Sequence, residues 1–127
     1  MFSHVMLGSN DLDRSRRFYD ALFAAIGGPK GRTDPAGRLI YAFKGGLLLL
    51  TRPLDGAPAT AGNGSTFGFA VDGPEQAEAW HRAGVEAGGT AIENPPGPRV
   101  MPFGELFLAY LRYPDGNKLC ALHRIAS

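Results

Sequence analysis

A pattern that occurs twice along the chain constrains the fold more than any other feature. Each half carries an aspartate, then a helical stretch around one aromatic residue, then a pair of glycines. A shift of 61 residues aligns Asp11 with Asp72, Tyr19 with Trp80, Ile26 with Ala87 and Gly27-Gly28 with Gly88-Gly89. Few residues are identical between the halves, but a fixed offset of this kind is typical of a repeated structural unit. We therefore expect two similar modules.

The first half is typical of a strand, a helix and a hairpin. The expected strands cover residues 2–8, 31–33, 38–43 and 46–52. Asn10 or Asp11 caps the helix between the first two strands, and its apolar residues recur three and four positions apart. Gly27-Gly28 ends this helix, because glycine readily adopts the left-handed backbone conformation beyond a helix. Lys44-Gly45-Gly46 forms the turn of the hairpin.

The second half repeats this order after a loop. Residues 54–64 contain many chain-breaking residues and little apolar bulk, which is typical of an exposed linker. Asp72-Gly73-Pro74-Glu75 predicts a helix start with a capping box, and Gly88-Gly89 predicts the helix end. A stiff, proline-rich loop covers residues 94–98. The expected strands cover residues 66–71, 90–93, 106–112 and 118–124.

These elements predict an α+β fold. Each half consists of a strand, a helix and about three more strands, and neither half alone covers both faces of its sheet. Two such halves side by side would form one curved mixed sheet, with the helices outside and a cup inside. We expect a single domain over residues 1–127, with module one at about 1–53, a linker at 54–64 and module two at 65–127.

Composition excludes several classes of function. The 127 residues carry 13 Lys and Arg against 12 Asp and Glu, a net charge of +1, so no nucleic-acid partner is expected. The longest aliphatic run, Leu47 to Leu50, is far too short to cross a membrane. The start of the chain has neither a basic segment nor a long apolar one, so no signal peptide is expected. The single cysteine, Cys120, fits a reducing compartment, and we expect a cytoplasmic protein.

Four segments of the chain carry a family resemblance. They are His4-Val5, Asn10-Asp11-Leu12 with Phe18-Tyr19-Asp20, Gly62-Asn63-Gly64-Ser65-Thr66, and Tyr113-Pro114-Asp115-Gly116-Asn117-Lys118. In this order and spacing they resemble the vicinal oxygen chelate superfamily, which includes glyoxalase I, fosfomycin-resistance enzymes, extradiol dioxygenases and bleomycin-binding proteins. The resemblance covers nearly the whole chain. It implies paired βαβββ modules, a cup-shaped pocket for a small-molecule ligand and, commonly, a homodimer.

The resemblance also implies where a metal ion would bind. Members with metal chemistry hold one divalent ion through a His on the first strand and through His or Glu on three later strands. His4 matches the first position, whereas the second falls on Thr66 by the Gly-Asn-Gly segment or on Ser65 by the offset between the helices. The third falls within residues 47–50, and the last, usually Glu, is Cys120. We therefore expect a degenerate site with no metal, or with one weakly held Zn, Mn or Ni ion on His4 and Cys120.

Candidate ligand-binding residues come from the resemblance and from the segment after the proline-rich loop. In relatives this segment often closes over the ligand, and an arginine there can form a bidentate pair with a carboxylate or phosphate. Aromatic residues of the strands either line an apolar pocket or pack in the core: Phe43, Phe67, Phe69, Phe107 and Tyr110. Each candidate also has an ordinary structural interpretation, such as a buried histidine or a solvated arginine. The predicted ligand-binding residues are His4, Thr66, Arg99, Met101, Phe103, Phe107 and Cys120.

The sequence leaves three functions open. The first is a protein that binds a small, partly apolar molecule in a cup-shaped pocket whose metal site is degenerate. The second is a divalent-metal-dependent lyase or isomerase of the lactoylglutathione lyase type, which needs metal ligands that the chain does not clearly supply. The third is a structural or regulatory relative whose own side chains fill the pocket. No catalytic residue is predicted, so whether the chain is an enzyme stays open.

Overall fold

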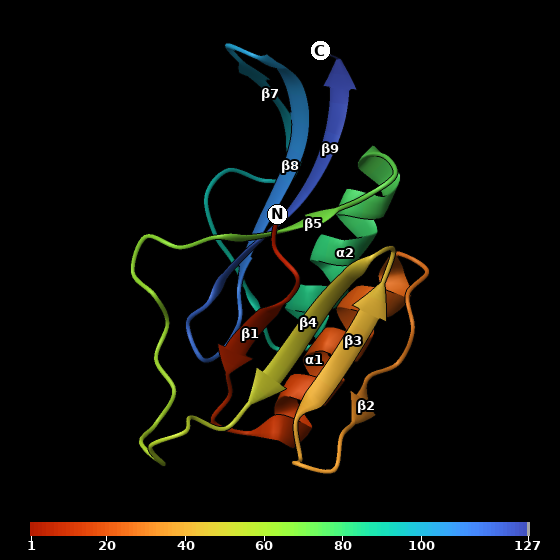
Figure 1. Cartoon of the computed structure of the whole chain (residues 1–127). Helices are drawn as coiled ribbons and strands as arrows, with labels where there is room; N and C mark the ends of the chain where they lie inside the picture. Colours follow the sequence, from red (N-terminus) through yellow and green to blue (C-terminus); the bar gives the residue numbers. More distant parts are fainter. Residues whose placement is uncertain (127) are drawn as a thin grey trace.

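The computed structural model describes residues 1–126 and contains two modules that follow the same order of elements (Figure 1). Module one consists of β1 (Val5–Gly8), α1 (Leu12–Ala25), β2 (Arg32–Thr33), β3 (Leu39–Phe43) and β4 (Gly46–Thr51). Module two consists of β5 (Phe67–Ala70), α2 (Pro74–Glu86), β6 (Thr90–Ala91), β7 (Gly97–Met101), β8 (Gly104–Arg112) and β9 (Lys118–Ala126). The prediction of an α+β fold with two similar modules is confirmed.

Each module forms one mixed sheet. The strand order is β1-β4-β3-β2 in module one and β5-β9-β8-β6 in module two, and β7 pairs with β8 along the same edge as β6. The first strand of each module runs parallel to the last, β1 to β4 and β5 to β9. No strand pairing joins the two sheets within residues 1–126, so the sheet surface is open rather than closed. The outer edges of β1 and β5 are consequently free there.

The two helices begin in different ways. The Asp11 side chain caps α1 by accepting a hydrogen bond from the Arg14 backbone N–H at 3.0 Å, as the sequence predicted. The predicted capping box of α2 is wrong, because Gly73 is the N-cap residue and makes no side-chain hydrogen bond. The Asp72 carboxylate instead accepts hydrogen bonds from Lys44 of the β3–β4 turn, at 2.9 and 3.0 Å.

One hydrophobic core joins the modules, because α1 and α2 pack against each other and each covers one face of a sheet (Figure 1). The helices approach closely at Gly84 of α2. A Cβ atom at this position would lie 2.2 Å from Leu111 of β8 and 3.0 Å from Leu22 of α1. Trp80, Tyr19 and Phe18 are fully buried in this core. The sheet faces that point away from the helices, which were expected to line the cup, are called the outer faces below.

A polar joint also connects the start of α1 to the β8–β9 turn. The Ser15 hydroxyl shares hydrogen bonds with the hydroxyls of Ser9 and Tyr113, both at 2.6 Å, and all three residues are buried. The carboxylate of Asp115 accepts a hydrogen bond from the Asn10 backbone N–H at 3.0 Å and forms an ion pair with Arg14. Two of the segments that carry the family resemblance are therefore in direct contact and hold the modules together.

Two strands differ from their predicted extents. β1 begins at Val5 rather than at residue 2, so that His4 precedes the strand; residues 1–4 are exposed. β7 begins at Gly97, inside the predicted loop 94–98, and Pro98 lies opposite Phe107 of β8. β7 pairs only with β8, and an edge strand tolerates proline because the N–H that proline lacks faces away from the sheet. No helix of the described chain is long and apolar enough to span a membrane.

Candidate functional site

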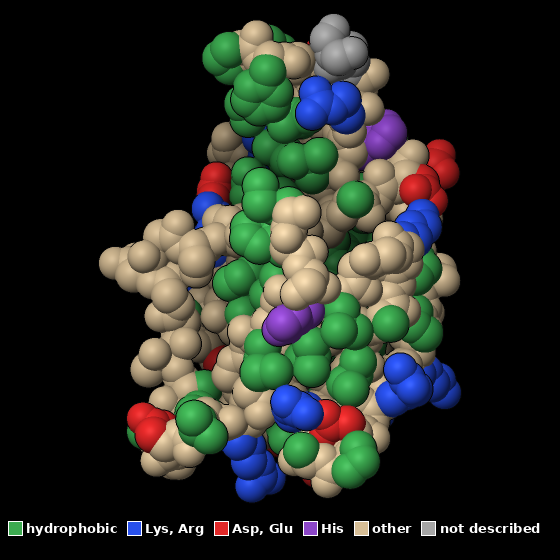
Figure 2. Space-filling view, viewed as in Figure 1, with side chains coloured by type: hydrophobic (Ala, Val, Ile, Leu, Met, Phe, Trp, Pro, Cys, Tyr) green, Lys and Arg blue, Asp and Glu red, His purple; other side chains and the backbone are tan. Residues whose placement is uncertain are grey.

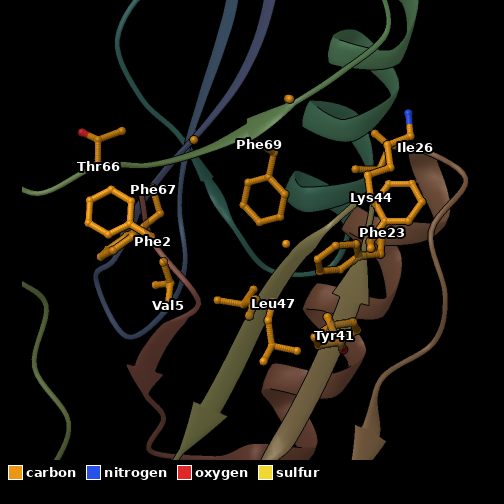
Figure 3. A pocket seen from close by; sticks show the side chains of 15 residues that line it. Phe2, Val5, Phe23, Ile26, Tyr41, Lys44, Leu47, Thr66, Phe67 and Phe69 are labelled. Carbon is orange, nitrogen blue, oxygen red and sulfur yellow. The ribbon is translucent and has the colours of Figure 1, made fainter.

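A pocket of about 580 Å³ lies between the two modules (Figure 3). The free edge of β5 borders it on one side, and β3, β4 and the end of α1 border it on the other. Its wall is largely apolar, and aromatic side chains dominate it. The aromatic residues of the wall are Phe2, Phe23, Tyr41, Phe43, Phe67 and Phe69. This pocket lies where no strand pairing joins the two sheets within residues 1–126.

The aromatic rings on the module-one side form an ordered wall. The rings of Phe23 and Tyr41 are stacked, with centroids 4.5 Å apart and planes 9° apart. Phe69 from β5 meets Phe23 edge to face at 5.5 Å, which is a favoured arrangement of two aromatic rings. Phe69 also lies 5.6 Å from the buried Trp80, so the shared core supports the wall from behind. A flat apolar ring can add to such a wall by stacking or by an edge contact.

The two ionisable side chains of the wall, Tyr41 and Lys44, are already paired. The Tyr41 hydroxyl donates a hydrogen bond to the Asp20 carboxylate at 2.6 Å. Burial, and then the neighbouring Asp20, raise the pKa of Tyr41 well above its usual value, so the phenol stays neutral. At the rim, the Lys44 ammonium holds the pKa of the exposed Asp72 carboxyl below its usual value. The pocket therefore offers apolar contact and little unpaired charge.

Cys120 lies outside this pocket, on the outer face of the second sheet. It is 5% exposed and packs with Leu106 and Leu108, under the partly buried Met101 and Tyr110. Burial raises the pKa of the Cys120 thiol, with smaller opposing effects from Tyr110 and Lys118. A buried thiol with a raised pKa is a poor nucleophile and a poor metal ligand, because both roles need the thiolate.

His4 and Arg99 do not converge on a ligand site. The exposed His4 shares a hydrogen bond between its Nδ1 and the Ser3 hydroxyl at 2.7 Å. Arg99 donates to backbone carbonyls of its own loop, including Gly97 at 2.9 Å and Pro95 at 3.1 Å. The guanidinium group thus holds the proline-rich loop against β7 instead of standing free for a bound anion.

The remaining predicted residues lie in different places. Thr66 lines the pocket between the modules. Phe103 is 61% exposed in the β7–β8 turn, and Met101 lies against the Cys120 cluster. Phe107 belongs to the shared core on the helix side of β8, whereas Cys120 faces the other way. The structure therefore does not bring the predicted residues together into one site.

The donor set of the chain does not fit a resident metal ion. Within residues 1–126, no three His, Cys, Asp or Glu side chains lie close enough together to hold one. A catalytic zinc site needs about three protein ligands. Of the two predicted ligands, one is exposed before β1 and the other is buried as a thiol in an apolar cluster.

Sequence reasoning found part of the aromatic wall and missed the rest. Phe43, Phe67 and Phe69 were candidates for an apolar pocket, and all three line it. Phe23 and Tyr41 were missed because helical and strand periodicity assigns both to the core, where one face of each ring also packs. Phe2 carries no periodic signal at all. The pocket arises from the spacing of the two modules, which no local pattern in the sequence reports.

Comparisons with known proteins agree with the fold. The family model of the Glyoxalase/Bleomycin resistance protein/Dioxygenase superfamily matches residues 1–121. A glyoxalase/bleomycin resistance protein from Albidiferax ferrireducens T118 is 54% identical, with 98% of this chain and 99% of that chain covered and a TM-score of 0.94. A family enzyme from Burkholderia phytofirmans PsJN is 18% identical, with 97% and 98% covered and a TM-score of 0.73, and shows the same fold. None of the curated proteins searched matches the chain.

Proposed function

Because the chain belongs to the Glyoxalase/Bleomycin resistance protein/Dioxygenase superfamily, we propose that it binds a small, largely apolar molecule in the pocket between its two modules. The observation that carries this proposal is the pocket itself, which is about 580 Å³ in volume and has aromatic side chains from both modules in its wall. Small-molecule sites are typically apolar clefts of roughly 300–1,000 Å³ with a few placed polar groups.

The wall favours a flat, aromatic ligand over a flexible or charged one. Phe23 and Tyr41 already stack in parallel, and Phe69 stands at an angle of 65° to Phe23. A planar ring against the open side of this wall gains contact area without disturbing an existing hydrogen bond, because the Tyr41 hydroxyl is directed to Asp20. The few polar groups at the border, Thr66 and the free edge of β5, suit a ligand with one hydrogen-bonding group.

We propose that this function needs no resident metal ion. The proposal is supported by the poor fit of His4 and Cys120 to a metal site, and it separates a binding protein from a metal-dependent lyase of the lactoylglutathione lyase type. Metal analysis of protein purified without an affinity tag tests it, with His4→Ala as the control. We expect well under one equivalent of metal per chain before and after incubation with zinc, manganese or nickel. Stoichiometric metal that the variant loses would support the lyase instead.

The outer face of the first sheet supports a homodimer as the working assembly. Met6 is 40% exposed and Leu47 37% exposed there, and Figure 2 shows a band of apolar side chains that runs from the β7–β8 hairpin down over this face. Apolar surface of this kind often lies at contacts between proteins. Light scattering during size exclusion is expected to give twice the mass of one chain, and a monomer at micromolar concentration would contradict the proposal.

A titration with a neutral aromatic dye tests the binding function. N-phenyl-1-naphthylamine fluoresces when it enters an apolar site, and we expect saturable binding to the folded protein. Leu48→Glu places a carboxylate at the half-buried pocket wall and should weaken binding about tenfold or more, since burying a charge without a partner is costly. Leu54→Glu makes the same change in the exposed linker and should leave the affinity unchanged. No saturable binding, or equal loss in both variants, would overturn the proposal.

A further inference from the structure

A second, polar pocket of about 380 Å³ lies at the end of the linker. Residues 61–66 form one wall, and Arg112 and Lys118 form the other. Unlike the pocket between the modules, it has no aromatic residue in its wall. We propose that this pocket binds a tetrahedral oxyanion of the phosphate type, a proposal that stands independently of the apolar pocket.

The two cations are placed directly opposite each other. Arg112 ends β8, Lys118 begins β9, and the two are partners in the antiparallel register. Like charges at directly opposed positions of a sheet destabilise it, because their Cβ atoms are only about 4.5–5.5 Å apart. An anion between the two side chains would convert this repulsion into two attractions. The arrangement therefore favours an anionic occupant.

The charges around the pocket leave a positive excess. Lys118 forms an ion pair with the half-exposed Glu93, and its ammonium lies 4.8 Å from the centre of the Tyr110 ring. Arg112 donates one hydrogen bond to the Gly116 carbonyl, which is neutral. Glu93 thus balances one of the two positive charges. The guanidinium group keeps further N–H donors, and such a group recognises phosphate oxygens in a planar, two-pronged manner.

The opposite wall supplies backbone donors. Ser65 N–H closes a turn onto the Gly62 carbonyl at 3.3 Å, with Gly64 at a φ of 97° between them. Within the described chain, the backbone N–H groups of Asn63, Gly64 and Thr66 make no hydrogen bond. Successive free N–H groups in a glycine-containing turn form concavities that bind anions. This turn and the two cations line the same pocket from two sides, an arrangement that suits a tetrahedral oxyanion.

Inorganic phosphate is the probe for this site, and amide chemical shifts in 1H–15N NMR spectra are the readout. At constant ionic strength, held with sodium chloride, phosphate should shift the amide signals of Asn63, Gly64 and Thr66 along one saturable curve in the millimolar range. The combined variant Arg112→Gln with Lys118→Gln should weaken this binding at least tenfold. Arg124→Gln removes an exposed cation further along β9 and should change it less than twofold.

The remainder of each spectrum reports whether a variant is folded. If the combined variant does not fold, Lys118→Gln alone replaces it, because Arg112 then keeps its hydrogen bond to the Gly116 carbonyl of the turn. This single variant removes one of the two cations and should still weaken phosphate binding about threefold or more. Absence of a saturable shift up to 50 mM phosphate would overturn the proposal. Equal phosphate affinity in the native protein and the folded variants would overturn it as well, because binding would then not involve the two cations.

Discussion

The two modules share one order of elements, yet they use the outer faces of their sheets differently. In module two, β7 adds a strand beside β6, and Leu106, Leu108 and Cys120 are buried on the outer face. In module one no such strand is present, and Met6 and Leu47 stay exposed. Met101 of β7 thus adds to a buried apolar cluster on the outer face of module two, whereas on the corresponding face of module one Leu49 is buried and its neighbours are exposed.

Trp80→Ala should cause the largest loss of folding stability, because it removes the largest fully buried side chain of the core that both modules share. Trp80 is fully buried and supports Phe69 at the pocket wall. Large-to-small changes of this kind cost about 3–5 kcal/mol of folding stability. Urea denaturation followed by circular dichroism measures the loss. A single transition at lower urea is expected, and two separate transitions would show that the modules unfold independently.

A matched pair of leucine truncations sharpens the comparison of the outer faces. Leu108 is 3% exposed in the closed outer face of module two, whereas Leu47 is 37% exposed in module one. In protein dilute enough to be monomeric, Leu108→Ala should cost about 2–4 kcal/mol and Leu47→Ala less than about 1 kcal/mol, because a buried leucine loses both its transfer energy and its packing. If urea denaturation gives equal losses of folding stability for the two variants, the outer face of module one is also covered in solution, as it would be within a dimer that persists on dilution.

The reactivity of the Cys120 thiol tests how tightly the outer face of module two is packed. Its burial and its raised pKa both lower the concentration of accessible thiolate. Alkylation by iodoacetamide at pH 8, followed by mass spectrometry, should therefore be about tenfold or more slower in native protein than in urea. Similar rates in the two conditions would show an accessible, reactive cysteine. Cys120 would then again be a candidate nucleophile or metal ligand.

The ion pair across the pocket rim should have the smallest effect. Lys44 lowers the pKa of Asp72. The contribution of this ion pair to folding stability is therefore present above the ordinary carboxyl pKa and is lost as the pH falls through the lowered value. Both side chains are more than half exposed, and exposed ion pairs contribute little because water and salt screen them. Lys44→Gln should leave the melting temperature at pH 7 unchanged within error. A clear decrease would show that this contact fixes the spacing of the modules.

The sequence predicts the architecture well because its main signals are local. Asp11 caps α1, the glycine pairs end both helices, and the Tyr113–Asn117 turn joins β8 to β9. The start of β7 was missed because Pro98 argues against a strand, although an edge position tolerates it.

The site is predicted less well because it depends on the spacing between modules. The resemblance drew attention to the strand positions of His4 and Cys120, while the pocket lies beside Phe23, Tyr41 and Phe69. Helical and strand periodicity assigns such residues to the core, and it does not show that one side of the wall stays open. A single sequence contains no direct signal for a distance between two packed modules.

The most direct test of the central claim compares two exposed phenylalanines. Phe2 lines the pocket between the modules, whereas Phe103 lies in the β7–β8 turn of module two, outside that pocket. The dissociation constant of N-phenyl-1-naphthylamine is measured for Phe2→Ala and Phe103→Ala. We expect about fivefold weaker binding in the first variant, equivalent to roughly 1 kcal/mol, and no change in the second. Loss of affinity in Phe103→Ala alone would contradict the account and place the ligand on the outer face of module two.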